Sequence, residues 1–404
     1  MAAGNATLTT LSNVLKTRFE KKLQIMSYED DHFLTNVAKA TDFGGKDYRQ
    51  SLRYGSPQGG SSVLATAISN KSSSEDVGFL ITRVRDYHVC SIDAEAMFAG
   101  QGDENTVIDA MDGEMEGGLR MIGRSLQIGV WGDGSGRRGA INSTVTGTTL
   151  TLSDPNEIVN FERYMKIQFV DPSALTNRAG GPLTINSVNR DAGSMVVSAN
   201  LNTITGLTAG DYIVRDGDTN VMMKGLAAWL PLTKPTSGDS FFGVDRSVDA
   251  TRLAGVGYTG GGAQKTETLI KAIVRLSREG GTHAKRNGYL HLDDLADIAI
   301  GLGSKVEYMP ASNSEGTIGF ASLVINTPRG PLKLYSSLNC KKGEFFILQM
   351  DTWKLKTLKK APHIVDDDGQ TMVRGATTDD VTWRLRYWGN LVCNAPGWNC
   401  HGTF

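Results

Sequence analysis

The chain has 404 residues, of which 40% are hydrophobic and 21% charged, and its formal net charge is −1. This composition predicts folded domains with buried cores and argues against global disorder. The near-neutral charge gives no whole-molecule indication of a dedicated nucleic-acid or membrane binder. At about 150 residues per domain, the length predicts two to three domains, and the 47 glycines indicate a loop-rich fold.

The cysteines and the N-terminal residues bear on the compartment. The four cysteines form no CxxC pair and are too few for a disulfide scaffold, so reduced thiols are expected. The first residues, Met1–Asn5, are neither basic nor apolar, which argues against a signal peptide. Apolar stretches such as 225–232 are far shorter than the roughly 20 residues that cross a bilayer. A protein made and assembled in the cytosol is the expectation.

The N-terminal 26 residues predict an amphipathic helix, because their apolar side chains recur every three or four positions. The opposite face is basic, and we interpret it as a solvated helix face rather than a site for nucleic acid or a partner chain. The apolar stripe consists of Leu8, Leu11, Leu15, Phe19 and Leu23.

A long hairpin is predicted next. Residues 55–74 are half serine and glycine and show no helical period, and the strand-like stretch Val77–Cys90 follows them. A lone hairpin is marginal in water, so this projection is expected to rest on something such as another subunit.

The longest helix signal follows, with apolar residues at intervals of three and four over about 28 residues, or about 42 Å. We expect Met115, Leu119 and Ile122 on its buried face. Several interior glycines each cost up to about 1 kcal/mol relative to alanine, so close packing must support this helix. The apolar residues are Ile108, Met111, Met115, Leu119, Ile122, Leu126 and Val130, and the glycines are Gly113, Gly117, Gly118 and Gly123.

Residues 140–222 change to short strands separated by turns about every ten residues, which predicts a small barrel or sandwich inserted into the chain. Helices are expected at 264–277 and 293–302, followed by strands. In the last strand, 381–392, alternate residues should face and pack along the long helix. The expected insertion core is Ile167, Phe169, Leu183, Ile185, Val197 and Ile213, and the expected inner face of the last strand is Val381, Trp383, Leu385 and Tyr387.

No recognised catalytic or cofactor motif is present: the sequence has no GxSxG, HExxH, P-loop or EF-hand. Gly134–Gly139 matches the dinucleotide spacing, but a helix precedes it and strands follow, the reverse of the required context. We therefore expect no catalytic, cofactor or metal site.

Three polar clusters have simpler interpretations. Cys393, Cys400 and His401 lack a fourth zinc ligand and are interpreted as small buried residues. Asp293, near His291, is interpreted as a helix cap with Asp294 beside the helix dipole. The basic patch around Trp353 is interpreted as a solvated strand rather than a phosphate contact; it comprises Lys354, Lys356, Lys359 and Lys360.

The order of these parts resembles the major capsid protein of tailed bacteriophages, the Hong Kong 97 type of fold. Two stretches of sequence, 289–305 and 387–398, also look like phage capsid sequences. The resemblance implies an α+β fold with a small β-barrel-like insertion and peripheral and axial domains. Its parts would be the N-terminal arm (1–41), the extended loop and start of the peripheral domain (42–103), the spine helix (104–139), the insertion (140–222), the axial domain with parts of the peripheral domain (223–376) and the C-terminal peripheral strand (377–404).

The implied function is a virion shell assembled in the host cytoplasm. Pentamers and hexamers of the chain would form an icosahedral head around double-stranded DNA, touching it weakly and non-specifically. The implied partners are other copies, a scaffolding protein, a portal and a cement protein, with no membrane and no cofactor.

Five residues are expected to serve structure or assembly. Some relatives form Lys–Asn isopeptide crosslinks, for which Lys71 with Asn394 or Asn399 would be the candidates, although we expect no crosslink. The five residues are Lys71, Leu119, Ile122, Trp383 and Trp398.

Two alternatives remain open. One is the shell of a cellular encapsulin-type nanocompartment, which would enclose enzymes instead of a genome. The other is an enzyme whose site is assembled from dispersed residues such as His291 and Asp293.

Overall fold

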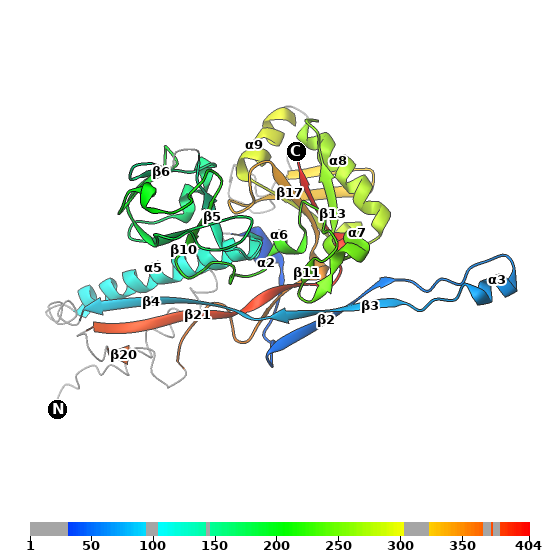
Figure 1. The fold of residues 1–404 in the computed structure, drawn as a ribbon, viewed down its shortest axis with the longest axis horizontal. Helices are drawn as coiled ribbons and strands as arrows, with labels where there is room; N and C mark the ends of the chain where they lie inside the picture. Colours follow the sequence, from blue (N-terminus) through cyan, green and yellow to red (C-terminus); the bar gives the residue numbers. More distant parts are fainter. Residues whose placement is uncertain (1–30, 94–103, 143–145, 303–322, 367–372, 375–379) are drawn as a thin grey trace, which may run out of the picture. The chain divides into compact units, whose positions relative to one another are not determined.

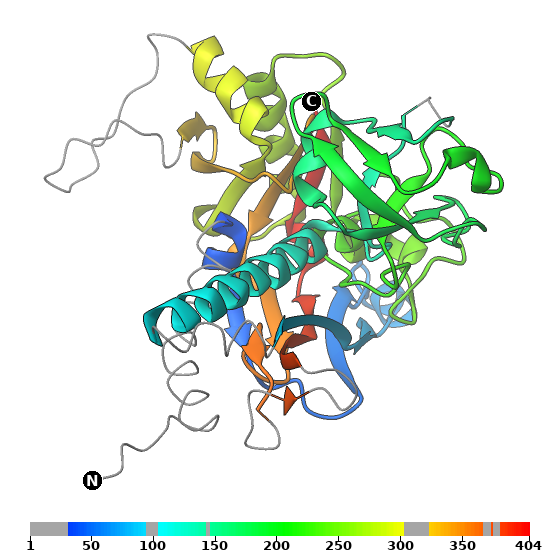
Figure 2. The ribbon, with the colours of Figure 1, turned by 90° about the vertical axis from the view of Figure 1, so that its left-hand side faces the viewer.

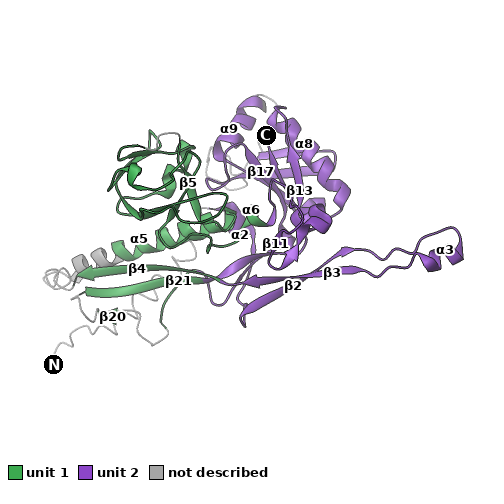
Figure 3. Cartoon of the chain, viewed as in Figure 1, with its two compact units in different colours: residues 1–23, 84–228, 362–387 green, residues 24–83, 229–361, 388–404 purple. Residues whose placement is uncertain are grey.

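The computed structural model describes residues 31–93, 104–142, 146–302, 323–366, 373–374 and 380–404 (Figure 1). They fall into two compact units (Figure 3). Of the described residues, unit 1 contains those within 84–228 and 362–387, and unit 2 contains those within 31–83, 229–361 and 388–404. The predicted N-terminal helix lies outside the described residues.

Unit 1 is built around α5 (Glu104–Trp131), a helix of 28 residues that confirms the predicted one. Met115, Leu119 and Ile122 are at most 3% exposed. The helix packs against β4 (Val84–Asp93), which pairs with β21 (Asp380–Cys393). Within unit 1, β21 also pairs with β19 (His363–Ile364) and β20 (Val373–Arg374).

The close packing expected at the helix glycines occurs at Gly118. A Cβ built there would collide with Cys90 Sγ of β4 and lie 3.2 Å from Leu385 Cδ1 of β21. At Gly117 a Cβ would meet nothing within 4 Å, as at Gly113. The backbone of α5 therefore approaches its sheet at one glycine and faces open space at its neighbour.

The predicted inner face of β21 is confirmed, since Val381, Trp383, Leu385 and Tyr387 are all at most 1% exposed. The residues that alternate with these, on the opposite face of β21, are not all exposed to solvent. Arg386 is only 7% exposed, and its Nε lies 3.1 Å from His363 Nε2. The neighbouring strand β19 covers this arginine, a long-range pairing that alternation along one strand cannot reveal.

Between residues 137 and 215, six strands of unit 1 form a sheet in the order β5-β10-β7-β8-β9-β6, beside the C-terminal end of α5 (Figures 1 and 2). We keep the name insertion for this predicted segment. A bridge between Ile141 and Leu152 joins the two outer strands, which brings the sheet close to a barrel. All six predicted core residues belong to one buried cluster. The elements are β5 (Arg137–Ala140), β6 (Thr149–Thr151), η2 (Pro155–Asn160), β7 (Lys166–Val170), β8 (Leu183–Asn189), β9 (Ser194–Val197), η3 (Leu201–Thr203) and β10 (Tyr212–Arg215).

Unit 2 has a mixed six-stranded sheet in the order β13-β22-β17-β14-β16-β15. Two helices, α8 (Lys265–Leu276) and α9 (Leu292–Leu302), pack apolar side chains into the core of this sheet, as the predicted helices require. The strands are β13 (Val256–Thr259), β14 (Arg286–Leu290), β15 (Leu323–Thr327), β16 (Gly330–Ser336), β17 (Glu344–Gln349) and β22 (Cys400–Thr403).

The predicted hairpin also belongs to unit 2. Strands β2 (Asp47–Gly55) and β3 (Glu75–Thr82) pair antiparallel, and the short helix α3 (Leu64–Ser69) lies between them. Two expectations need correction. First, the stretch 77–90 forms two strands and not one, since β3 ends at Thr82 and β4 begins at Val84. Second, residues 55–74 contain the helix α3, because leucine and alanine at 64–69 favour a helical turn between the flanking glycine and serine residues.

The remaining elements of unit 2 start at α2 (His32–Asn36), where Asp31 Oδ1 accepts hydrogen bonds from Phe33 N and Leu34 N. After it, β1 (Ala38–Ala40) pairs parallel with β18 (Trp353–Thr357), which pairs antiparallel with the last part of β21. The other elements are β11 (Ser240–Phe241), β12 (Val244–Asp245), η4 (Arg246–Asp249), α7 (Ala250–Ala254), η5 (Ser277–Glu279), η6 (His283–Lys285), η8 (Met350–Thr352) and η9 (Pro396–Trp398). The short helix α6 (Leu226–Trp229) has its first three residues in unit 1 and its last residue in unit 2. Among the described residues, no helix combines the length and apolar character needed to span a membrane.

Candidate functional site

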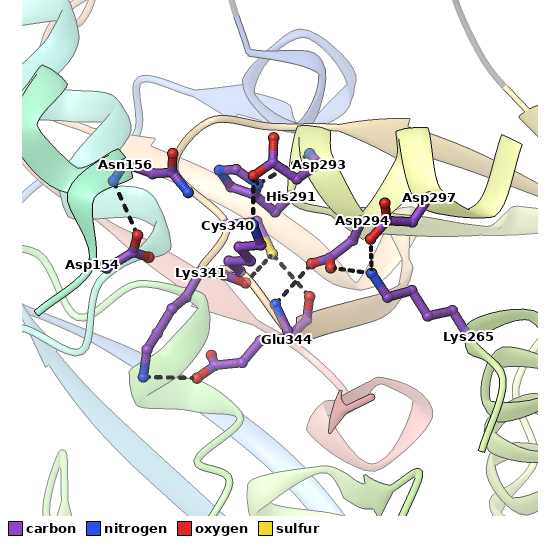
Figure 4. Close-up of polar contacts among 12 residues, drawn as sticks. Asp154, Asn156, Lys265, His291, Asp293, Asp294, Asp297, Cys340, Lys341 and Glu344 are labelled. Carbon is purple, nitrogen blue, oxygen red and sulfur yellow. Dashed lines mark hydrogen bonds and ion pairs between the residues drawn. The ribbon is translucent and has the colours of Figure 1, made fainter. Parts of the chain in front are cut away.

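The cluster at the start of α9 is structural (Figure 4). Asp294 accepts hydrogen bonds from Lys265 Nζ at 2.7 Å and Gly343 N at 2.8 Å, and Lys342 Nζ lies 2.9 Å from Asp293. These contacts fasten α9 to α8 and to the turn before β17. The cap assignment is wrong in one respect: α9 begins at Leu292, and His291 Nδ1, not Asp293, accepts the backbone N–H of Asp293 at 3.1 Å.

The cysteine and histidine residues near the C-terminus are buried, as interpreted. Burial raises the pKa of the Cys393 and Cys400 thiols to about 12, so both remain protonated at neutral pH. The His401 ring stacks on Phe346 at 3.9 Å, and its Nε2 lies 3.1 Å from Glu344 Oε2. Within the described ranges, no group of three His, Cys, Asp or Glu residues is placed to hold a metal ion.

The glycine-rich stretch after α5 is a turn and not a nucleotide loop. Gly134 and Gly136 have φ of +94° and +85°, and the chain continues into β5 of the insertion. A Cβ at Gly136 would collide with the backbone of Asp218. The glycines here serve the helix-to-strand turn and a close backbone approach.

The five residues predicted to serve structure or assembly are not brought together. Leu119, Ile122 and Trp383 are each 1% exposed in unit 1, whereas Trp398 is 39% exposed in η9 of unit 2. Lys71 is exposed between α3 and β3. Their roles in assembly remain predictions.

The two candidate crosslinking asparagines differ in accessibility. Asn394 is half-buried, whereas Asn399 is fully buried. The side-chain oxygen of Asn399 accepts hydrogen bonds from Gln349 N and Trp353 Nε1 at 2.8 and 3.0 Å, so this amide is already committed to the fold of its own chain.

The base of the hairpin, in contrast, is a dense polar and aromatic contact. Lys356 Nζ lies 2.9 Å from Asp42 Oδ2 and 3.8 Å from the centre of the Tyr48 ring in β2. Burial alone would lower the pKa of Lys356, but the hydrogen bonds to Asp42 and Tyr48 raise it, so it stays charged. The interpretation of the basic patch as solvated is therefore wrong for Lys356, whose side chain is 6% exposed.

The second strand of the hairpin is held at its base by aromatic packing. The Phe79 ring meets Trp229 edge-on at 5.1 Å, and Arg83 donates to the carbonyl of Phe43 at 3.2 Å. Leu80 N also donates to the carbonyl of Phe242. Both strands thus leave the body of unit 2 in a direction set by buried contacts.

The tip of the hairpin, unlike its base, exposes apolar side chains to solvent. Strands β2 and β3 extend away from the rest of unit 2, with α3 at the far end (Figure 3). Val63, Leu64 and Ile68 are 56%, 75% and 53% exposed, and no residue of α3 is buried. The sequence prediction missed this apolar surface, although the spacing of Leu64 and Ile68 by four residues was a signal for it.

Comparisons with known proteins identify the fold. No protein-family model and no curated protein matches the chain. The chain is similar to a chain of the cyanophage A-1(L) capsid asymmetric unit, with a TM-score of 0.51 and 9% identity over 88% of this chain and 87% of that one. This likeness confirms the predicted α+β fold of the Hong Kong 97 type.

Two further solved structures are similar with lower TM-scores. The capsid of a native GTA particle has a TM-score of 0.45 and 7% identity, covering 94% of this chain and 90% of that one. A virus-like particle from Pyrococcus furiosus has a TM-score of 0.38 and 6% identity, covering 95% and 98%. The boundaries of the arm, peripheral, axial and insertion domains remain predictions.

Proposed function

We propose that the chain is the major capsid protein of a phage head and assembles, as pentamers and hexamers, into an icosahedral shell around double-stranded DNA. The observation that carries the proposal is the hairpin of unit 2, with its charged clamp at the base and its uncovered apolar tip. The likeness in fold to a phage capsid chain supports the same assignment.

In an isolated subunit, the apolar side chains at the tip of the hairpin are exposed to water, which is energetically unfavourable. Fully burying a valine, leucine or isoleucine side chain is worth roughly 1.5–3 kcal/mol, and Val63, Leu64 and Ile68 are each more than half exposed. A two-stranded hairpin is marginal by itself. Contact between α3 and a second copy of the chain would cover these side chains, and because every copy carries the same tip, the contact would repeat around a closed symmetric assembly.

The clamp at the base supports a mechanical role. The ion pair and cation–π contact of Lys356 join β18 to β2, so the direction of the hairpin is fixed before assembly. A preset direction lowers the conformational entropy lost when the tip docks. We assign no catalytic step and no cofactor to the chain. A scaffolding protein, a portal and a cement protein are its proposed partners, and the virion is its proposed location.

Substitutions at the tip test the proposal. In the full-length protein, Leu64→Asp combined with Ile68→Asp should leave the subunit folded, because neither side chain is buried, but should abolish shells in electron micrographs. Ala65→Asp, an exposed change on the same helix, is the matched control and should still assemble. Normal shells from the double variant would refute the role of the tip.

A second experiment distinguishes a phage head from a nanocompartment by identifying what the shells contain when they form in the presence of the packaging proteins. Packaged double-stranded DNA supports the phage head, and protein cargo without DNA supports the nanocompartment alternative.

A further inference from the structure

A buried cluster of charges lies where the insertion of unit 1 joins α5 and β4. Arg215 Nη2 of β10 lies 2.6 Å from Asp86 Oδ1 of β4, and Arg215 Nε lies 2.8 Å from Asp218 Oδ2. Arg138 Nη2 of β5 lies 3.6 Å from Asp218 Oδ2 and donates to Ser125 Oγ of α5 at 3.3 Å. Ser125 Oγ in turn donates to Asp86 Oδ2 at 2.5 Å. We call these five residues the junction.

Four of the five junction residues are nearly closed to solvent, and the fifth, Arg215, has a side chain that is 24% exposed. Asp86 and Arg138 are each 3% exposed, Asp218 is 7% exposed and Ser125 is fully buried. Its two arginines and two aspartates balance in charge. The pairing is needed because a buried charge without a partner is strongly destabilising.

Two buried donors, one in the junction and one on β21, have no acceptor among the described residues. Among the described residues, neither Arg138 Nε nor Tyr387 Oη has a hydrogen-bond partner. Tyr387 is fully buried, and burial raises the pKa of its hydroxyl well above the usual value, so the hydroxyl remains a donor. Buried polar atoms in native proteins are nearly always satisfied by protein groups or ordered water.

A small cavity lies beside these atoms. Its volume is about 10 Å³, and its lining includes Arg138, Asp218, Gly129 and Met223. A Cβ built on Gly129 would lie 3.3 Å from Met223 Cβ and 3.7 Å from Tyr387 Oη. Tyr387 does not itself line the cavity, but its hydroxyl lies near Gly129 and Met223, two residues that do. About 10–15 Å³ is the space that one water molecule requires.

We propose that this cavity is a binding site for one ordered water molecule, which accepts hydrogen bonds from Arg138 Nε and Tyr387 Oη and donates to the Asp218 carboxylate. The chemistry around the cavity selects water. An anion could not donate to Asp218 and would find no surplus positive charge in the junction. A metal cation could not accept from either donor.

The site goes beyond the proposed function, because it concerns how the insertion is held and not how shells form. Strands β5 and β10 bring Arg138 and Arg215, and α5, β4 and β21 bring Ser125, Asp86 and Tyr387. The water completes a network that fixes the root of the insertion against three other elements.

Two measurements on the full-length protein test the proposal. A density map at about 2 Å resolution should show an isolated peak within about 2.6–3.2 Å of Arg138 Nε and Tyr387 Oη. The Tyr387→Phe variant, which keeps the ring, should show a lower denaturation midpoint. Tyr164→Phe is the matched control in the same unit, because Tyr164 is 68% exposed, and its midpoint should not change.

Any of three results would overturn the assignment. The first is an empty cavity in the map of the unsubstituted protein. The second is an unchanged or higher midpoint for Tyr387→Phe, because removing a hydroxyl that has no partner relieves a penalty instead of creating one. The third is replacement of the peak by bromide after soaking, which would identify an anion.

Discussion

The contact between α5 and its sheet makes a sharp prediction at two adjacent glycines. Replacing Gly118 with alanine places a methyl group against Cys90 Sγ and close to His88 and Leu385, whereas the same change at Gly117 meets nothing within 4 Å. In a helix interior, alanine is favoured over glycine by about 1 kcal/mol. Overpacking a core typically costs about 1–3 kcal/mol.

Gly117→Ala should therefore stabilise unit 1 by about 0.5–1 kcal/mol. Gly118→Ala should be roughly 1–3 kcal/mol less stable than Gly117→Ala, since both gain the same helix propensity and only one creates a clash. Urea denaturation of unassembled subunits, followed by circular dichroism, measures both values.

A rescue experiment tests the cause of the loss. Cys90→Ala removes the sulfur atom that the new methyl group meets, so Gly118→Ala should be less destabilising in that background than in the original chain. Equal stability of the Gly117→Ala and Gly118→Ala proteins, or no rescue by Cys90→Ala, would refute the packing described for α5.

Three other predictions follow from the same contacts. Trp383→Ala should lower the free energy of unfolding of the subunit by about 3–5 kcal/mol, measured by denaturant melts, because it leaves a large cavity. The control Arg384→Ala, at an exposed position, should change this free energy little. If Trp383→Ala leaves the stability unchanged but blocks assembly, this face of β21 lies at an interface between subunits instead. Limited proteolysis should cut within residues 55–74 quickly in free subunits and much more slowly in shells, and equal rates would contradict docking of the hairpin. Burial raises the pKa of Glu344, but hydrogen bonds from His401 and Lys341 outweigh it and leave the pKa below 4.5. The ionised carboxylate therefore contributes stability above pH 4.5 that is lost as the pH falls through the folded value, and Glu344→Gln should flatten the acid limb of the stability–pH curve, whereas an unchanged limb would show that the pair contributes nothing.

The spacing of apolar residues predicted those helices and strands in which buried positions recur at regular intervals along the chain. The apolar residues of α5 recur every three or four positions, and those from Met115 to Val130 are buried, so spacing alone located the helix and these buried residues. Alternation likewise located the insertion core and the inner face of β21. The glycine run on α5 indicated a close approach, but not that Gly118 makes it and Gly117 does not.

The missed features depend on partners distant in sequence. Lys356 looks like one of several surface lysines until Asp42 and Tyr48, more than 300 residues earlier, enclose it. Arg386 is buried because His363 lies on the adjacent strand. The junction joins Asp86 to Arg215 across 129 positions. No local pattern marks such pairs, because each charged residue alone is typical of a solvated surface.

The central claim is that copies of this chain build a closed shell. Cryo-electron microscopy of the purified full-length protein, expressed with and without the proposed scaffolding protein, tests it most directly. We expect icosahedral particles made of pentamers and hexamers, with α3 of each subunit covered by a neighbouring copy. A uniform population of 43.5 kDa monomers under every assembly condition, or particles in which Leu64 and Ile68 remain exposed to solvent, would contradict it.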